Sequence, residues 1–403
     1  MRDMLPADMA LFRHVEGVFR DCCLKWGYRE VKTPTVEYMH LFTSTGTLTP
    51  GMLGKVYSFL DWDGWSGERV VLRPDCTIPV ARLYIESSQG RSSPAKLFYV
   101  TNVFAFEETG RESRERWQCG AEFLGGRAPG TDAELVALAL EVARLLGLYG
   151  AEVRLSHVGV LRALLRQLAL TEEEESEVLD RVLDGNVEAL SRLSSQKSEL
   201  GGALSLLLGQ SGGSRGSLKN LRSLCGAGMK ELARELDDFV ALVDVLEAVG
   251  CPYRVDMGSA RGFEYYTGAT FQFMCRGRRI GAGGRYDALV PMMGGGDVSA
   301  CGFALYLDCL MPLLQAGVGQ VPSWKGIYIT LAGDPASLKA AFGVARVLRE
   351  AGFVADVDLS GGGKTGWDWR LDVQPSSFTL KNSKGESFSV ASVAELLRLL
   401  EAR

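Results

Sequence analysis

The first candidates for chemistry are two glycine-rich segments that could bind phosphate groups. Gly363-Lys364-Thr365 matches the end of a P-loop, but the first glycine of that motif would fall at Asp358. Trp367 to Leu371 favours an extended chain, whereas a P-loop leads into a helix. Gly281-Ala282-Gly283 lacks the spacing of a dinucleotide-binding loop, and close backbone approach in a sheet explains its glycines better. Neither segment predicts a nucleotide site.

Cysteine and histidine side chains are the next candidates, because they could hold a metal ion. The chain has nine cysteines and three histidines, and no two cysteines form a CxxC pair. Zinc and iron–sulfur sites are usually built from such close pairs, so we expect neither a metal site nor a cofactor. An odd number of cysteines without a disulfide framework is typical of reduced, buried thiols.

Charge and hydropathy limit the classes of partner. The 403-residue chain has a formal net charge of −5, which argues against a broad nucleic-acid surface. Met1 to Pro6 contains no apolar signal core. The stretch Ala133 to Gly150 is interrupted by Glu134, Glu141 and Arg144, a spacing that predicts an amphipathic helix and not a membrane span. We therefore expect a cytoplasmic protein without membrane association.

The elements that must position polar side chains begin with a helix–strand pair. Apolar residues recur at helical spacing from Pro6 to Trp26, and Gly27 ends this helix. Tyr28 to Thr33 then predicts a strand that Pro34 stops. Further strands are expected at residues 55–60, 69–72, 96–106, 116–123, 253–256 and 270–275, and the third and fourth of these would form a hairpin around the charged loop 107–115.

The middle and the end of the chain predict two further parts. Residues 157–250 favour a helical module inserted into the core, and a helix is expected at about Cys301 to Leu314. Gly317 to Trp324 has the composition of a linker. Residues 325–403 predict a small α/β domain with strands at 326–331 and 354–357 and helices at 336–351 and 393–402. The core would span residues 1–320, and the fold class is α+β.

Four segments, in this order along the chain, resemble histidyl-type class II aminoacyl-tRNA synthetases. Trp26 to Tyr38 is similar to motif 1, the dimer interface of that family, and Leu97 to Gly125 is similar to motif 2. Leu72 to Thr77 (Leu-Arg-Pro-Asp-Cys-Thr) resembles the strand end whose acid holds the substrate α-amino group. Arg261 to Gly268 (Arg-Gly-Phe-Glu-Tyr-Tyr-Thr-Gly) is close to the family's histidine-recognition motif. Taken alone, the first segment fits an ordinary helix–strand pair better, and Leu72 to Thr77 fits a surface turn equally well.

The resemblance implies a class II synthetase-like antiparallel sheet with flanking helices, and a histidine pocket. Gln118 and Glu122 match the family's substrate-reading glutamine and glutamate, and Gly281 to Asp287 resembles its glycine-rich strand. An ammonium group needs a desolvated carboxylate partner, and carboxylates and phenols can bind the donors of an imidazole ring. The implied histidine-binding residues are Asp75, Thr77, Gln118, Glu122, Arg261, Tyr265, Tyr266 and Tyr286.

The same resemblance implies that the ATP side of the pocket is lost. In active synthetases an arginine of motif 2 grips the α-phosphate and an arginine of motif 3 stacks on the adenine, and the matching residues here are Ala105 and Cys309. One lost donor to a developing negative charge typically costs about 2.7–4 kcal/mol. We therefore expect no catalytic residues and no aminoacylation. Ala105 also removes a cation near the substrate carboxylate, which leaves Arg261 as its partner.

The Phe263-Glu264 pair of the recognition motif resembles the regulatory paralogue more than the synthetase. The resemblance then implies a non-catalytic regulatory subunit of ATP phosphoribosyltransferase, needed for activity and for histidine feedback control of the first step of histidine biosynthesis. The implied partners are a short-form catalytic subunit, L-histidine and a second copy bound through motif 1. No tRNA is expected, because residues 325–403 begin like an anticodon-binding domain but are truncated after Val357. The alternatives are a divergent histidyl-tRNA synthetase and a paralogue recruited to another protein or RNA task.

Overall fold

The computed structural model divides the chain into two compact units, Met1–Gly319 and Gln320–Arg403. Each unit is considered by itself. The residues that the structure describes are 3–44, 56–62, 67–88, 93–106, 114–166, 171, 215–226, 228–259, 265–315, 326–332, 334–361, 366–374 and 377–402.

The first unit is built on an eight-stranded sheet with the strand order β1-β5-β6-β11-β10-β9-β7-β8. Neighbouring strands are antiparallel from β5 to β7 and parallel at the two ends, where β1 pairs with β5 and β7 with β8. The predicted α+β core is therefore confirmed. The strands are β1 Arg29–Glu30, β5 Ala95–Phe104, β6 Glu115–Leu124, β7 Glu152–His157, β8 Tyr253–Val255, β9 Ala269–Cys275, β10 Arg278–Arg285 and β11 Ala300–Tyr306.

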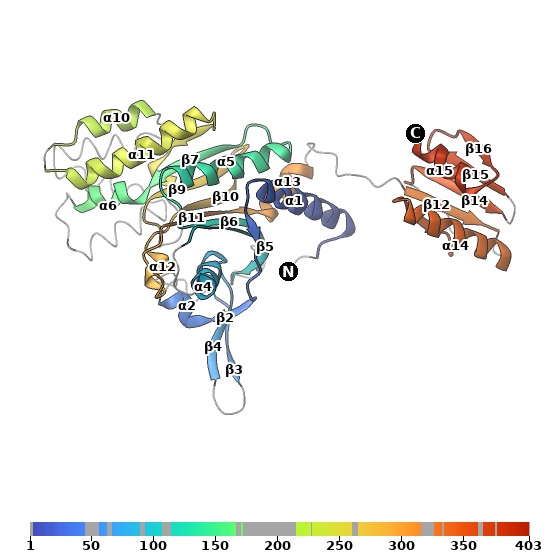
Figure 1. Cartoon of the computed structure of the whole chain (residues 1–403), viewed down its shortest axis with the longest axis horizontal. Coiled ribbons are helices and arrows are strands. Elements are labelled where there is room, and N and C mark those ends of the chain that lie inside the picture. The colour runs from blue at the N-terminus through green and yellow to red at the C-terminus, as the bar shows by residue number, and fades with distance from the viewer. Residues whose placement is uncertain are drawn as a thin grey trace. The chain divides into compact units, whose positions relative to one another are not determined.

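Helices α1 (Pro6–Lys25) and α5 (Gly130–Leu145) cover one face of this sheet (Figure 1). The side chain of Phe19 on α1 packs edge-on against Phe98 and Phe303 of the sheet. Beyond α1, the phenol of Tyr28 donates a hydrogen bond to Glu134 of α5 at 2.9 Å. The predicted first helix is thus confirmed, and its apolar stripe is the surface that fixes it to the sheet.

Helix α4 (Thr77–Ser88) lies on the opposite face of the sheet, and a three-stranded sheet with the order β2-β4-β3 lies next to it (Figure 1). Arg82 of α4 forms an ion pair with Glu37 of the small sheet at 2.7 Å. The remaining elements of this unit are β2 Val36–Tyr38, β3 Ser58–Trp62, β4 Gly67–Leu72, α2 Met39–Thr43, α6 Val158–Arg166, α10 Arg215–Ser223, α11 Lys230–Ala248, the short 3-10 turn Met257–Ser259, α12 Leu289–Met292 and α13 Leu307–Gln315.

The helix expected at Cys301 to Leu314 is wrong in its first half. Residues up to Tyr306 form β11, and α13 begins only at Leu307. β11 is a central strand between β6 and β10, and six of its seven residues from Ala300 are apolar. A strand covered on both faces shows no alternation of polar and apolar residues, so its sequence resembles a buried helix.

The described part of the expected helical module 157–250 begins at the end of β7 and continues as α6, α10 and α11. Its other residues, 167–170, 172–214 and 227, lie outside the described residues, as does most of the charged tip of the β5–β6 hairpin. The hairpin itself is confirmed, because β5 and β6 pair in register from Ala95 opposite Leu124 to Phe104 opposite Glu115.

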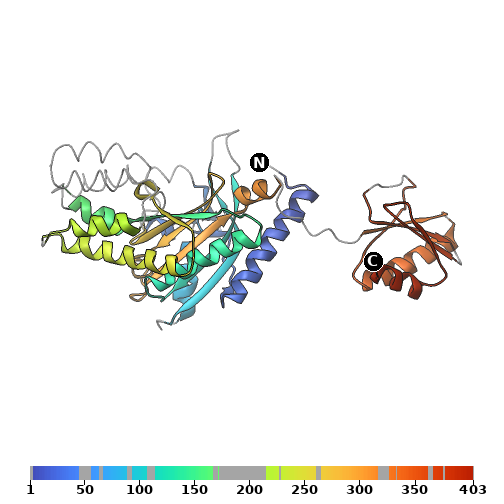
Figure 2. The same ribbon diagram turned by 90° about the horizontal axis from the view of Figure 1, so that it is seen from above.

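The second unit is a five-stranded sheet with the order β13-β12-β14-β15-β16. Helices α14 and α15 lie on the same side of it (Figure 2), over a core that includes Ile327, Leu371 and Leu396. The uncovered face carries polar side chains such as Arg370 and Lys381, which lie opposite each other across two strands. The elements are β12 Gly326–Leu331, α14 Pro335–Glu350, β13 Val354–Val357, β14 Trp369–Gln374, β15 Ser377–Asn382, β16 Ser387–Val390 and α15 Val393–Glu401.

Arg73 joins three parts of the first unit just beyond the end of β4. Its guanidinium donates to the carbonyl oxygens of Thr33 and Pro34, both at 2.9 Å, and of Asn102 at 2.8 Å. It also donates to the side chains of Thr101 and Asn102. Only 2% of Arg73 is exposed, so these neutral oxygens replace water around a buried charge.

Replacing Arg73 with lysine should destabilise the first unit by roughly 2–4 kcal/mol, because an ammonium group cannot reach all the acceptors on the segment after β1 and on β5 at once. Urea unfolding followed by circular dichroism measures the change. Arg69→Lys is the matched control, since Arg69 is exposed on β4, and it should shift stability by less than about 0.5 kcal/mol. Equal effects of the two substitutions would contradict this account.

Candidate functional site

Three glycines form the floor of a site on the α4 side of the large sheet. They are Gly120 of β6, Gly302 of β11 and Gly284 of β10. A Cβ atom on Gly302 would lie 1.6 Å from a carboxylate oxygen of Glu122, and one on Gly120 would lie 2.2 Å from the ring of Tyr99. On Gly284 it would lie 2.9 Å from the ring of Tyr266. The missing side chains therefore let polar and aromatic groups lie flat against the sheet.

Glu122 is the centre of the site. Its Oε1 accepts hydrogen bonds from the hydroxyl of Thr77 at 2.9 Å and from the phenol of Tyr99 at 3.3 Å. Its Oε2 accepts from the phenol of Tyr286 at 2.5 Å. The donors come from α4, β5 and the end of β10, so the contacts exist only when these segments are folded together.

Burial raises the pKa of Glu122 to about 8, although the hydrogen bonds from Tyr286 and Thr77 oppose this rise. The nearby carboxyl of Asp75 raises the pKa of Glu122 further. The carboxyl group of Glu122 is thus largely protonated near neutral pH. A bound cation would favour its ionised form, because opposite charges at close range stabilise each other.

Asp75 lies beside the site but points its carboxylate at the start of α4. Its Oδ2 accepts a hydrogen bond from the backbone N–H of Ile78 at 3.1 Å, as an N-terminal helix cap does. Burial raises the pKa of Asp75, and hydrogen bonds from the amides of Ile78, Thr77 and Cys76 oppose the shift. Asp75 is therefore held at a helix N-terminus, where the helix dipole favours negative charge.

Three tyrosines form an aromatic wall of the site. Tyr265 contacts Tyr266 at a ring-centroid distance of 5.1 Å and Tyr286 at 5.7 Å, both edge-on. Burial raises the pKa of each of these phenols well above its ordinary value. They are neutral hydroxyl groups at physiological pH and can donate hydrogen bonds to a ligand or to Glu122.

Gln118 lies on the same face of β6 as Glu122, with Gly120 between them. Its amide oxygen is buried and accepts no hydrogen bond from any residue that the structure describes. Buried acceptors are usually satisfied, so this oxygen is available to an N–H donor of a ligand. The hydroxyl of Thr270, on β9 opposite Gly284, is also buried and without a partner in the described part of the chain.

The structure therefore brings together most of the residues expected at a histidine pocket. Thr77, Glu122 and Tyr286 touch directly, Tyr265 and Tyr266 adjoin them, and Asp75 and Gln118 border the group. Arg261 lies outside the described residues. Sequence reasoning missed Tyr99 and Thr270, although the pairing of two alternating strands could have placed Tyr99 on the same face as Glu122.

Neither of the two positions that match arginines of active synthetases, Ala105 and Cys309, carries a basic side chain. Ala105 follows β5 and presents only a methyl group, while its backbone N–H donates to the carbonyl of Arg114 at 3.1 Å. Cys309 lies in the first turn of α13 and carries a thiol group. Neither side chain can neutralise a phosphate group.

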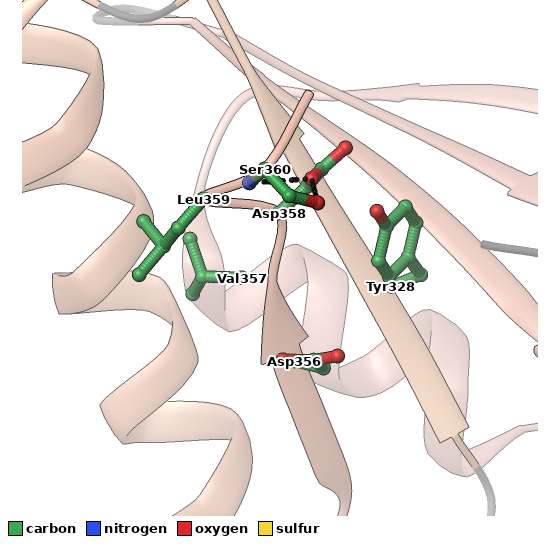
Figure 3. Close-up of a pocket in the computed structure, with 6 residues that line it drawn as sticks. All are labelled: Tyr328, Asp356, Val357, Asp358, Leu359 and Ser360. Atoms are coloured by element: carbon green, nitrogen blue, oxygen red, sulfur yellow. Dashed lines mark hydrogen bonds between the residues drawn. The ribbon is translucent and has the colours of Figure 1, made fainter. Parts of the chain in front are cut away.

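Other possible sites are weaker. Among the described residues no cluster of three or more His, Cys, Asp or Glu side chains could hold a metal ion, and no described helix is long and apolar enough to cross a membrane. Gly363-Lys364-Thr365, the P-loop fragment, lies outside the described residues. A hollow of about 180 Å³ in the second unit is lined by residues that include Tyr328, Asp356 and Asp358 (Figure 3).

Asp358, which lines this hollow, already accepts hydrogen bonds from its own loop. Oδ1 of Asp358 accepts from the backbone N–H groups of Ser360 at 3.1 Å and Gly361 at 2.9 Å. Its pKa is lowered to about 2, first by a hydrogen bond from Tyr328. Because the loop itself satisfies this carboxylate, the hollow is not a candidate for ligand binding.

Comparison with known proteins matches the sequence of this chain to one family. The family model described as histidyl-tRNA synthetase matches residues 1–310. An ATP phosphoribosyltransferase regulatory subunit of Dehalococcoides mccartyi (strain BAV1) is 48% identical over 92% of this chain and 90% of its own length. A histidine–tRNA ligase of Methanosarcina acetivorans is 35% identical over 86% of this chain and 81% of its own length.

A solved structure supports the same relationship. The crystal structure of an ATP phosphoribosyltransferase regulatory subunit/histidyl-tRNA synthetase from Bacillus halodurans superposes with a TM-score of 0.78 and 25% identity. The match covers 91% of this chain and 93% of that one. The expectation of a class II synthetase-like sheet core is thereby confirmed.

The raised pKa of Glu122 predicts a pH-dependent stability. Its folded pKa of about 8 exceeds the ordinary 4.5, so the group stabilises the fold fully below pH 4.5 and loses this contribution as the pH rises towards 8. In the wild type the free energy of unfolding should decrease between pH 5 and pH 8, and Glu122→Gln should make this decrease smaller by roughly 2–4 kcal/mol. Urea unfolding across this range measures it. Glu86→Gln, on the exposed side of α4, is the control, and a wild-type slope in Glu122→Gln would refute the assignment.

Proposed function

The chain belongs to the histidyl-tRNA synthetase family, and we propose that within it the chain is a non-catalytic regulatory subunit of ATP phosphoribosyltransferase. The observation that carries this function is the higher identity to a regulatory subunit, 48% over about nine-tenths of both chains, against 35% for a tRNA ligase over 86% of this chain. In this role the protein works in the cytoplasm, is needed for the activity of a short-form catalytic subunit and mediates histidine feedback control of the first step of histidine biosynthesis.

The chemistry of the two lost positions supports a role without catalysis. Attack on the α-phosphate of ATP builds negative charge that preorganised cations normally stabilise. With Ala105 and Cys309 at the matching positions, two such donors are missing, and each loss typically costs about 2.7–4 kcal/mol. Even with incomplete additivity, adenylate formation should fall by several orders of magnitude.

The amino-acid side of the site supports binding of free L-histidine. Glu122 supplies a buried carboxyl group, Gln118 a buried amide oxygen without a partner among the described residues, and Tyr286 a neutral phenol. A ligand with an ammonium group and an imidazole N–H provides donors for both oxygens. Coupling of about 1–3 kcal/mol between this site and a partner subunit would suffice for feedback control.

The proposed assembly contains the catalytic subunit and a second copy of this chain bound through the α1–β1 region. We propose that residues 325–403 form a shortened anticodon-binding-like domain and that tRNA is not a ligand. A divergent histidyl-tRNA synthetase is the second candidate, favoured by the family match over residues 1–310.

Histidine binding can be tested by calorimetry. The wild type should release heat with L-histidine at or below millimolar concentration. Gly302→Ala should weaken binding at least tenfold, because its methyl group would displace the Glu122 carboxylate. Gly17→Ala is the matched control, since beyond the neighbouring residues and backbone of its own helix no atom lies within 4 Å of the added Cβ, and it should bind normally. If Gly302→Ala fails to fold, Thr77→Val removes one donor to Glu122 with less disturbance. Absence of heat in the wild type would exclude a histidine sensor.

The regulatory role and the absence of catalysis can be tested together. ATP–pyrophosphate exchange with histidine should stay at background, whereas a histidine–tRNA ligase gives strong exchange under the same conditions. Affinity purification from the native host should recover a short phosphoribosyltransferase, whose activity should rise when the purified chain is added. Exchange at synthetase level, or recovery of tRNA in place of the phosphoribosyltransferase, would support the synthetase candidate instead.

A further inference from the structure

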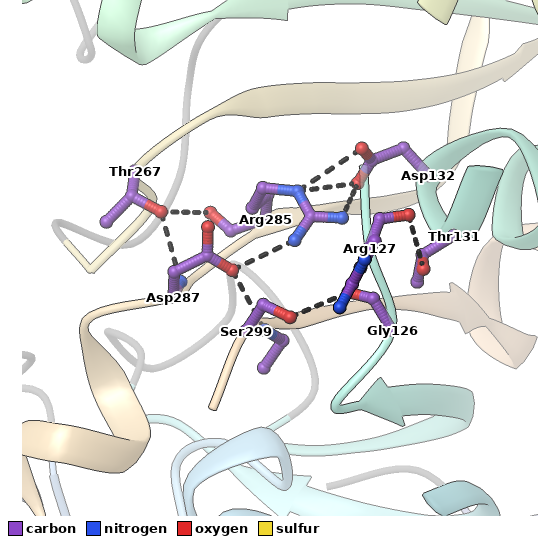
Figure 4. Close-up of polar contacts among 9 residues, drawn as sticks. Gly126, Arg127, Thr131, Asp132, Thr267, Arg285, Asp287 and Ser299 are labelled. Atoms are coloured by element: carbon purple, nitrogen blue, oxygen red, sulfur yellow. Dashed lines mark hydrogen bonds and ion pairs between the residues drawn. The ribbon is translucent and has the colours of Figure 1, made fainter. Parts of the chain in front are cut away.

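Arg285 and Tyr286 are consecutive residues at the end of β10, and their side chains point to opposite faces of the sheet. Tyr286 points to the site, where its phenol binds Glu122 at 2.5 Å. Arg285 points to the helical face, where its Nε donates to both carboxylate oxygens of Asp132 on α5, at 3.1 and 3.2 Å (Figure 4). Successive side chains of a strand alternate in direction, so a shift of either residue moves the other.

The ion pair of Arg285 with Asp132 is buried, and Arg285 also binds a second carboxylate, that of Asp287. Arg285 is 6% exposed and Asp132 is 2% exposed. Nη1 of Arg285 also donates to Oδ1 of Asp287 at 2.9 Å. A planar guanidinium can serve two carboxylates from fixed directions, whereas an ammonium group cannot. The residue is therefore locked in place by groups from α5 and from its own strand end.

The same network fixes the segment that leads out of the recognition motif. The backbone N–H of Asp287 donates to the hydroxyl of Thr267 at 3.0 Å, and the N–H of Thr267 donates to the carbonyl of Arg285 at 2.8 Å. Oδ1 of Asp287 also accepts from the N–H of Ala300 at 2.9 Å, at the start of β11. These contacts of Arg285, Asp287 and Thr267 (Figure 4) therefore tie the strand end that carries Tyr286 to the segment that carries Tyr265 and Tyr266.

The close fit extends to Gly268, where an added Cβ would lie 3.0 Å from Cδ of Arg285. The side chain of Arg285 therefore passes directly beneath the segment that carries Tyr265 and Tyr266. Arg285 does not reach the ligand site, because the sheet lies between its side chain and that site.

We propose that Arg285 is a positioning residue for the ligand site: its ion pair with Asp132 holds Tyr286 and the Tyr265–Thr267 segment in the geometry that binds the ligand, without touching that ligand. The proposal rests on the histidine pocket described under the proposed function. It adds a residue from outside the pocket whose effect passes through Tyr286.

A double-mutant cycle tests this. Arg285→Lys and Tyr286→Phe should each weaken L-histidine binding about tenfold in calorimetry, and the double variant should be at most about threefold weaker than the more affected single variant. Additive losses, or no loss in Arg285→Lys, would overturn the proposal. Arg82→Lys, which alters an ion pair of similar type between α4 and the small sheet, is the control and should bind normally.

A second readout separates positioning from loss of stability. The hydrogen bond from Tyr286 lowers the pKa of Glu122, so displacement of the phenol should move the pH midpoint of the Glu122-dependent stability change upwards in both Arg285→Lys and Tyr286→Phe. Loss of stability without this upward shift would mean that Arg285 is merely structural. If Arg285→Lys does not fold, Asp132→Asn keeps the shape of the pair and should give the same shift.

The two readouts also distinguish failure of this proposal from failure of the proposed function. A wild type that binds no histidine while Arg285→Lys still shifts the Glu122 midpoint would reject the histidine pocket and keep the positioning role. A wild type that binds histidine with no effect of Arg285→Lys on either readout would reject the positioning role alone.

Discussion

The buried guanidinium of Arg73 is the interaction on which the first unit depends. It is a positive charge removed from water and surrounded by neutral oxygens of the segment after β1 and of β5. Such a charge is tolerated only when nearly every N–H finds an acceptor, so the three segments cannot move independently. Arg73 stands two residues before Asp75, and its position therefore fixes where α4 begins and where Thr77 meets Glu122.

The site that results is an acidic pocket over a glycine floor. Glu122 and Asp75 are both buried, and the donors that reach them are neutral hydroxyl and amide groups. Such a pocket favours a ligand that brings its own positive charge. Under the proposed function, Ala105 and Cys309 stand where a synthetase has cations for the phosphate groups, and neither side chain is a cation. The fold would then keep a place for an amino acid without the cations that activation needs.

The sheet also connects this pocket to its opposite face. Tyr286 and Arg285 belong to one strand end, so the aromatic wall of the site and the ion pair with α5 are parts of one rigid element. Buried charged networks of this kind are costly when only partly satisfied, and they therefore hold a single geometry. A pocket floored by glycine backbone needs such external support, because its floor has no side chains to pack.

The sequence by itself determined the features that depend on local pattern or residue type. The α1 stripe and the β5–β6 hairpin followed from spacing, and the resemblance of the polar segments to the family was enough to mark Ala105 and Cys309 as positions without arginine. Only the tertiary structure decided that residues 301–306 form a strand, that Asp75 caps α4, and that Tyr99 shares a face with Glu122. Glu122 and Tyr286 are 164 residues apart, so their contact and the raised pKa of Glu122 arise from strand pairing and burial. Neither strand order nor burial is set by local sequence, because both depend on which distant segments pair.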